Sequence, residues 1–375
     1  MGSTVIVTDA KYRASLALMR SLTAAGYKVI LTQTAAEADG AIPAFESKYA
    51  AEKRLFDCSL ESEAYTERLL ALCTEYDRPV LFPVGAKTLL TVSRNLDRFV
   101  RVCDLTVAAP EKLELANDKR EVAKYAEKLG IPIPHQYENG ELPSVYPVII
   151  KPVCGEKFGL GAAKRYAVAE NEAEYRRAYE RMSVYGKPIV QEKLTGEAVG
   201  VSLLMSAHGA VSAICHKRIR EYPASGGPSA CCESFFDETL VKDSERLLES
   251  LGFVGIAMVE YKAGRLLEIN PRVWGSFPLT YAADATFADD YVRLSRGEAI
   301  THALDNYKCR VRMNFVLSDL AAIFDYVRHG RFADAFGGVG DLVFRRAFEG
   351  MHDKYGNDSA PYRTYLKKKL FGKRK

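Results

Sequence analysis

The stretch Val254-Gly-Ile-Ala-Met-Val-Glu260-Tyr-Lys-Ala-Gly264-Arg-Leu-Leu-Glu268-Ile-Asn270-Pro-Arg272 predicts a β-hairpin. The apolar residues before Glu260 and the run from Leu266 to Asn270 are typical of strands. Ala263-Gly264-Arg265 is expected to form a three-residue turn between them. With such a loop, Glu260 and Glu268 lie directly opposite each other, and two carboxylates in that position repel unless a cation lies between them.

The second strand of this hairpin carries its polar residues at every second position. Glu268, Asn270 and Arg272 therefore share one face, provided that the strand continues to Arg272. Carboxylate and amide oxygens are ligands that Mg²⁺ accepts, usually together with phosphate oxygens. An ordinary exposed hairpin with polar residues on its solvent side is the alternative interpretation.

The composition is that of a soluble globular protein, with 375 residues, 48% hydrophobic and 27% charged. This length predicts two or three domains. We find no apolar run long enough to span a bilayer and no signal-peptide pattern at the N-terminus. The eight cysteines form no CxxC pair, which favours free thiols in a reducing cytoplasm over a disulfide framework or a zinc site. The adjacent pair Cys231-Cys232 seldom has the geometry for a disulfide.

The charge is distributed unevenly along the chain. Residues Arg363 to Lys375 contain seven Lys or Arg and no acid, so the net charge of +4 becomes −3 without them. Peripheral contact of this basic tail with an anionic membrane or with nucleic acid is one interpretation, and a solvated, partly frayed terminus is the other. No groove-reading motif or aromatic array is present, so we expect no nucleic-acid partner.

Strand and helix patterns alternate from residue 3 to residue 110. Strands are expected at 3–8, 29–31 and 79–82, with helices at 11–25 and 61–76, and this alternation predicts a parallel sheet in an α/β fold. The first turn has no GxGxxG motif for a dinucleotide. Further along, helices are expected on either side of residues 117–119, strands at 147–151 and 187–192, an antiparallel pair at 199–219 and a helix at 238–251. The segment 301–375 has mixed helical patterns.

Several motifs follow one another in a suggestive order. Ile150-Lys151-Pro152 ends a strand, Gln191-Glu192-Lys193-Leu194 ends another, and Glu268-Ile-Asn270-Pro-Arg272 closes the hairpin. This order resembles the ATP-grasp superfamily, which includes biotin carboxylase, the carbamoyl-phosphate synthetase large chain and D-alanine–D-alanine ligase. The resemblance covers roughly residues 1–300. It implies a pre-ATP-grasp α/β domain at 1–110, ATP-grasp subdomain A at 111–190, subdomain B with the metal and catalytic residues at 191–300, and a C-terminal extension with a basic tail at 301–375.

The resemblance also implies roles for individual residues. Two lysines would hold the ATP phosphates, a glycine-bearing loop at 155–161 would close over them, and the segment after Gln191 would contact adenine and ribose. The residues implied for ATP are Lys119, Lys151, Gly159, Gly161, Glu192, Lys193, Leu194 and Glu197. The implied magnesium or manganese ligands are Glu260, Glu268 and Asn270, with Arg272 over the reacting phosphoryl group.

A basic cluster at Lys217, Arg218 and Arg220 resembles the place where family members contact the γ-phosphate or an anionic substrate. Arg218 and Arg220 are expected to share a strand face and to join Arg272 as catalytic residues. Trp274 either lines the acceptor pocket or packs in the core.

These implied roles lead to one expected activity and two alternatives. The expected activity is that of an ATP-dependent carboxylate–amine ligase that passes through an acyl phosphate, with small-molecule acid and amine substrates. The alternatives are a bicarbonate-activating carboxylase or carbamoyl-phosphate-type enzyme, and a non-catalytic nucleotide-binding protein of the same fold. The oligomeric state stays open.

Overall fold

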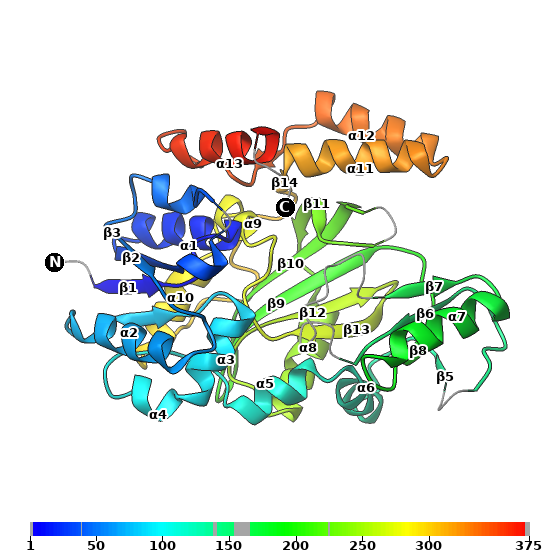
Figure 1. Ribbon diagram of the computed structural model, residues 1–375, viewed down its shortest axis with the longest axis horizontal. Helices are drawn as coiled ribbons and strands as arrows, with labels where there is room; N and C mark the ends of the chain where they lie inside the picture. The colour runs from blue at the N-terminus through cyan, green and yellow to red at the C-terminus, as the bar shows by residue number, and fades with distance from the viewer. Residues whose placement is uncertain (1–2, 39, 138–140, 154–165, 224–225, 372–375) are drawn as a thin grey trace.

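The computed structural model describes residues 3–38, 40–137, 141–153, 166–223 and 226–371 (Figure 1). Its strands form three sheets, of four, four and seven strands. The predicted α/β class is confirmed, because a parallel sheet at the N-terminus is followed by antiparallel and mixed sheets covered by helices. None of the helices within these ranges is long and apolar enough to cross a membrane.

The N-terminal sheet is parallel, as predicted, with the order β3-β2-β1-β4. Its strands are β1 (Thr4–Val7), β2 (Lys28–Thr34), β3 (Glu52–Phe56) and β4 (Val80–Phe82). Alternate residues of β1 supply two cores, since Val5 and Val7 pack with α1 (Arg13–Ala24) while Ile6 packs with α2 (Glu63–Thr74). The sequence analysis did not find β3, because an edge strand that begins Glu-Lys-Arg lacks the apolar pattern of a buried one.

Short helices complete the N-terminal region. They are η1 (Ala35–Glu37), η2 (Pro43–Glu46), α3 (Ala86–Arg94) and α4 (Leu96–Phe99). The buried Asp9 follows β1 with a φ of 56° and accepts hydrogen bonds from the Gly85 amide (2.9 Å) and the Thr88 hydroxyl (2.9 Å) at the start of α3. The first turn therefore anchors a helix instead of presenting a glycine loop to a ligand.

The helices α5 (Pro110–Asn117) and α6 (Lys119–Lys128) meet at Asp118, where the sequence predicted an interruption. The Asp118 carboxylate caps α6 by accepting hydrogen bonds from the Arg120 amide (2.9 Å) and the Glu121 amide (3.1 Å). This cap places Lys119 at the first position of α6, where its side chain projects from a fixed helix end.

The second sheet has the order β5-β8-β6-β7 and is antiparallel. Its strands are β5 (Gln136–Tyr137), β6 (Val148–Lys151), β7 (Ala167–Ala169) and β8 (Ile189–Glu192), and α7 (Glu172–Ser183) packs against β6 and β7. The predicted strands at 147–151 and 187–192 are therefore confirmed as neighbours. Lys151 lies at the end of one and Glu192 at the end of the other.

The third sheet is the largest and has the order β13-β12-β9-β10-β11-β14-β15. Its strands are β9 (Ala198–Ser206), β10 (Gly209–Glu221), β11 (Ser229–Phe235), β12 (Gly255–Lys262), β13 (Arg265–Asn270), β14 (Arg312–Asn314) and β15 (Phe348–Glu349). One face packs on α8 (Glu238–Ser250), and the other packs with α10 (Phe287–Ser295) toward the N-terminal sheet, with α9 (Pro278–Ala282) beside α1 (Figure 1). Side chains of β9 alternate between these two faces. Leu203 packs on the side of α8, and Leu204 packs on the side of α10 and the N-terminal sheet.

The C-terminal segment adds β14 and β15 to this sheet, with α11 (Val316–Arg328) and α12 (Phe332–Phe344) between these strands and α13 (Ala360–Phe371) after them. These helices lie along the upper edge of the molecule in Figure 1. Tyr362 and Tyr365 of α13 pack against the core that contains α1, so a frayed terminus is the wrong interpretation for residues 360–371. The predicted division at residues 110, 190 and 300 stays a prediction.

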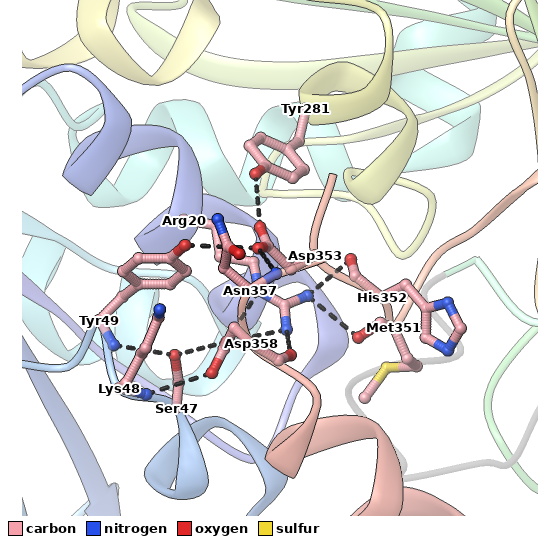
Figure 2. A network of polar contacts seen from close by, with 10 residues as sticks. All are labelled: Arg20, Ser47, Lys48, Tyr49, Tyr281, Met351, His352, Asp353, Asn357 and Asp358. Carbon is pink, nitrogen blue, oxygen red and sulfur yellow. Dashed lines mark hydrogen bonds and ion pairs between the residues drawn. The ribbon is translucent and has the colours of Figure 1, made fainter. Parts of the chain in front are cut away.

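A buried ion pair ties the C-terminal segment to the N-terminal region (Figure 2). The Arg20 guanidinium on α1 donates to the Asp358 carboxylate from Nε (3.1 Å) and Nη2 (2.9 Å), and the two side chains are 1% and 2% exposed. Its Nη1 donates to the carbonyls of Met351 (3.0 Å) and His352 (2.8 Å). Asp358 also accepts a hydrogen bond from the Ser47 hydroxyl (2.7 Å). Arg20 and Asp358, which are 338 positions apart in the chain, thus neutralise each other's charge.

The seven cysteines among the described residues are all free, as expected. The neighbouring Cys231 and Cys232 are buried on β11 and form no disulfide.

Candidate active site

The β12–β13 hairpin has a shorter turn than the sequence suggested. Ala263 and Gly264 form a two-residue turn with φ values of 49° and 72°, so Lys262 pairs with Arg265 and the predicted three-residue loop is wrong. Both residues have positive φ because this left-handed type of turn matches the twist of the two strands. Leu267 then forms a bulge, and the extra residue brings Glu260 opposite Glu268. The predicted pairing of the two carboxylates is therefore confirmed.

Each of the facing carboxylates has its own cation. The Lys119 Nζ lies 3.0 Å from the Glu268 carboxylate, and the Arg218 Nη2 lies 2.6 Å from the Glu260 carboxylate. The Asn270 amide nitrogen lies between them, 3.0 Å from Glu260 Oε1 and 3.4 Å from Glu268 Oε1. Positive charge and an amide donor thus offset the repulsion that the hairpin register creates.

The two carboxylates have different pKa values because their surroundings differ. Burial raises the pKa of Glu260, the Arg218 guanidinium opposes this rise, and the Glu268 carboxylate adds to it. Burial also acts to raise the pKa of Glu268, but the charges of Lys119 and Lys151 outweigh it and lower this pKa to about 2. Glu268 is therefore ionised throughout the physiological range, as a metal-binding carboxylate must be.

Lys151 at the end of β6 faces the same carboxylates. Burial and the positive charge of Lys119 lower its pKa to about 8, although Glu268 and Glu260 partly offset both effects. Lys119 also donates to the Val153 carbonyl at 3.4 Å. Two ammonium groups thus converge on one region from a helix N-terminus and a strand end, an arrangement suited to phosphate oxygens.

A small cavity opens beside the two lysines. Lys119, Lys151, Gln136 and Gln191 are the polar part of its lining, and the apolar part comes from α6, from the extended segment before β5, from β8 and from the hairpin bulge. The sequence analysis missed these apolar residues, which are Val122, Ala123, Ile133, Pro134, Ile189, Leu266 and Leu267. The only signal in the sequence was the extended run Ile131-Pro-Ile-Pro134.

The segment after Gln191 connects the second sheet to the hairpin. The Glu192 carboxylate forms an ion pair with Arg265 and accepts a hydrogen bond from the His135 amide (2.8 Å). The Lys193 amide donates to the Pro147 carbonyl (3.1 Å), and the exposed Glu197 accepts from the Ala263 amide through its carbonyl (2.9 Å). The cavity lining does not include Glu192, Lys193, Glu197 or the half-buried Leu194. Their nucleotide contacts stay predictions.

The two arginines of the basic cluster lie on opposite faces of β10. Arg218 pairs with Cys232 and Arg220 pairs with Cys231, because Ile219 is an extra residue in the strand. The predicted shared face is therefore wrong, since a bulge breaks the alternation of side chains. Arg218 reaches Glu260, whereas Arg220 forms ion pairs with Asp319 (2.5 Å) and Asp341 (2.8 Å) below the C-terminal helices. Lys217 forms a separate ion pair with Glu233 at 3.2 Å.

The strand β13 ends at Asn270 and does not continue to Arg272, as the predicted shared face of Glu268, Asn270 and Arg272 required. Arg272 nevertheless lies beside Asn270. Its amide donates to the Asn270 carbonyl (2.8 Å), and its Nη2 lies 3.5 Å from Asn270 Oδ1. Trp274 is 1% exposed and packs against Phe277 and Phe287, with ring centroids 5.1 Å away in each case, which favours the packing interpretation. Gly159 and Gly161 lie outside the described residues.

The side chains present fit Mg²⁺ with a nucleotide. Glu260, Glu268 and Asn270 offer hard oxygen ligands, and phosphate oxygens usually complete the coordination of Mg²⁺. Within the described ranges no three His, Cys, Asp or Glu side chains form a metal site by themselves. Lys119, Lys151, Arg218 and Arg272 supply the positive charge that a triphosphate requires.

Comparisons with known proteins agree with this geometry. A family model described as an ATP-grasp domain matches residues 116–276. The biotin carboxylase domain of 2-oxoglutarate carboxylase from Hydrogenobacter thermophilus, solved with MgADP, ADP and bicarbonate, is 14% identical, with a TM-score of 0.62 over 83% of this chain and 73% of that one. Biotin carboxylase from Campylobacter jejuni is 18% identical, with a TM-score of 0.58 over 83% of this chain and 74% of that one.

A ligase is also similar in fold. The L-amino acid ligase from Bacillus licheniformis is 14% identical, with a TM-score of 0.56 over 78% of this chain and 74% of that one. At these identities the similarity shows the fold alone. No curated protein matches the chain in a sequence search.

Proposed function

We propose that this chain, whose residues 116–276 match an ATP-grasp domain, is an ATP-dependent ligase that joins a carboxylate to an amine through an acyl phosphate. The observation that carries the proposal is the convergence of Lys119, Lys151 and the paired carboxylates Glu260 and Glu268 from four separate elements. A solvated hairpin would not need two half-buried lysines beside its carboxylates, since taking a charge out of water is costly.

The reaction would proceed in two transfers. A carboxylate oxygen of the acid attacks the γ-phosphorus of ATP, the bond to the β–γ bridging oxygen breaks, and ADP leaves. The amine nitrogen then attacks the acyl carbon, phosphate leaves, and the nitrogen loses a proton to give the amide. Neither step needs a protein nucleophile, so positioning and charge neutralisation supply the catalysis.

Each group of side chains would have its own task in these transfers. Lys119 and Lys151 hold phosphate oxygens, and Arg272 holds the transferring phosphoryl group or the acid. Glu260, Glu268 and Asn270 would hold Mg²⁺, which offsets the charge that develops on the phosphates. Arg218 holds Glu260 in place through its ion pair at 2.6 Å and opposes the rise of its pKa on burial.

Bicarbonate activation is the second candidate, since a structure similar in fold contains MgADP and bicarbonate. One experiment separates the two. Purified protein is given ATP and Mg²⁺ with pools of amino acids, small carboxylates or bicarbonate, and ADP release is measured for each. Stimulation that requires both an acid and an amine supports the ligase, whereas stimulation by bicarbonate alone supports the carboxylating reaction. Failure to bind ATP with Mg²⁺ would contradict both.

The Glu268→Gln variant tests the site itself. Removing this charge should lower ADP release at least about a hundredfold, because the metal and both lysines lose their shared partner. The matched control is Glu238→Gln, which changes an exposed glutamate of α8 that pairs only with Lys242 in a helical turn. Equal rates for the wild type and Glu268→Gln would exclude this hairpin as the metal site.

A further inference from the structure

Exposed apolar side chains concentrate on the three C-terminal helices. Among the described residues, 18 large apolar side chains are exposed, and eleven of them lie between residues 316 and 371. Phe336, Val343 and Phe344 are 77%, 68% and 86% exposed. Scattered surface apolar residues are normal, but a continuous patch of this kind marks a surface that meets a partner.

The patch follows the helical period. On α11 the exposed residues are Leu320, Phe324 and Val327, and on α12 they are Phe332, Phe336, Val339 and Val343. In both helices the spacing is i, i+4 and i+7, which forms a stripe along one side. The two helices are joined by residues 329–331 alone and pack beside each other as a helical hairpin (Figure 1).

Both stripes lie on the same side of this hairpin. The residues that pack between the helices are Ile323 and Tyr326 on α11 and Ala335 and Leu342 on α12. On each helix, viewed along its own chain direction, the exposed stripe lies about 90° around the helix axis from these contacts. The rotation has the same sense in both helices. Because the two helices run in opposite directions, this rotation brings both stripes to one face.

The hairpin does not use this face for its own stability. Its underside is held by the ion pairs of Arg220 with Asp319 and Asp341, and Gly338 of α12 packs closely on Ile323 of α11. The apolar stripes on the other side are therefore left for an external surface.

The charges around the patch are positive. The Arg328 guanidinium stacks over the Phe324 ring at 4.7 Å, Arg345 and Arg346 follow Phe344, and the exposed Lys367 and Lys369 of α13 precede the exposed Leu370 and Phe371. Of the nearby acids, Asp319, Glu349, Asp353 and Asp358 are buried, Asp325 is half-buried, and the exposed Asp334 of α12 forms an ion pair with Arg331. Asp341 is covered by ion pairs to Arg220, Arg312 and Arg345.

We propose that the α11–α12 hairpin, together with the end of α13, docks the protein on an anionic lipid bilayer. An amphipathic helical surface binds at the bilayer boundary when apolar side chains enter the acyl region and flanking Lys and Arg meet acidic headgroups. A second copy of this chain fits less well, because pairing the patch with itself would bring its flanking cations together. None of the residues of this surface belongs to the candidate active site, so docking and ATP chemistry can be tested separately.

Vesicle flotation tests the proposal. The full chain is mixed with vesicles of phosphatidylcholine and phosphatidylglycerol and with vesicles of phosphatidylcholine alone. We expect the protein to float with the first kind only and to be released as salt is raised. The double variant Phe336→Gln/Val343→Gln should partition at least about tenfold more weakly, because both side chains lose their favourable transfer into the acyl region. Lys367→Gln/Lys369→Gln should weaken binding and reduce its dependence on salt.

The matched control is the double variant Val145→Gln/Val184→Gln, which changes two equally exposed valines of the second sheet region, 67% and 75% exposed. It should float like the wild type, and thermal unfolding should show that all variants are folded. Equal binding to phosphatidylcholine alone, or no flotation at all, would overturn the proposal. So would a wild-type dimer that Phe336→Gln/Val343→Gln converts to a monomer without any vesicle binding. None of these readouts depends on ligase activity.

Discussion

Lys151 shows how one residue responds to its surroundings. A lysine on a surface keeps its charge to high pH, but this side chain is surrounded by protein and lies near a second ammonium group. The resulting pKa of about 8 places its titration within an accessible range. The nearby Glu268 stays ionised over the same range, so the charge of the site changes mainly through the lysine.

ATP binding should therefore weaken as the pH rises past about 8. The charged ammonium is the form that holds phosphate, and above the pKa the affinity should fall by up to about tenfold for each pH unit. Lys151→Arg keeps its charge and should give a flat profile. Titration of a fluorescent ATP analogue measures both, with Lys242→Arg on the exposed side of α8 as the control. A wild-type affinity independent of pH up to 9 would contradict this assignment.

At the scale of one element, the bulge in β10 divides the basic cluster into two functions. A regular strand would have placed Arg218 and Arg220 side by side, but the extra residue Ile219 turns them to opposite faces. One guanidinium then belongs to the candidate active site and the other to the anchor of the C-terminal helices.

Arg218→Gln should consequently affect the rate of ADP release, and Arg220→Gln should affect the stability of the fold. Arg218→Gln should lower the rate of ADP release at least about tenfold, because Glu260 loses its cation, with little change in stability. Arg220→Gln should leave the rate per folded molecule within about twofold but lower the free energy of unfolding, because the buried Asp319 loses its partner. Kinetics and urea denaturation on the same preparations measure both. A comparable loss of rate in the two variants would contradict the division.

At the scale of the whole molecule, the contacts of Arg20 join the two ends of the chain. The residues drawn in Figure 2 come from α1, from the segment at 47–49, from α9 and from the segment 351–358. This network holds the C-terminal segment against the N-terminal region, and the same segment leads into α13. The proposed docking surface therefore depends on contacts made far from it in sequence.

Arg20→Met should lower the free energy of unfolding by about 3 kcal/mol, because a buried carboxylate is left without its cation. The fluorescence of Trp274, the single tryptophan, follows unfolding in urea. Lys28→Met is the control, since it removes an exposed ion pair with Glu52 and should change stability little. A stability loss in Arg20→Met no larger than that in the control would show that the network contributes little.

The local elements could be predicted because their causes are local. Strand β1, helix α1 and the interruption at Asp118 follow from apolar periodicity and from a capping side chain, and the β12–β13 hairpin follows from its strand patterns and turn residues. The pairing of Glu260 with Glu268 was predicted from a three-residue loop, whereas a two-residue turn and a bulge produce it. By itself the sequence determined an α/β protein with a polar hairpin, two strand-end motifs and their order along the chain. Those features depend on residues within a few turns of one another.

The tertiary structure alone decided which of these side chains meet. It placed bulges at Leu267 and Ile219, lined the cavity with apolar residues from four separate segments, and left an apolar face on α11 and α12. A pattern of period two cannot locate an extra residue in a strand, because its side-chain types are the same on either side of the bulge. An amphipathic helix likewise does not reveal which partner covers its apolar face. Both depend on packing between segments that are distant in the chain.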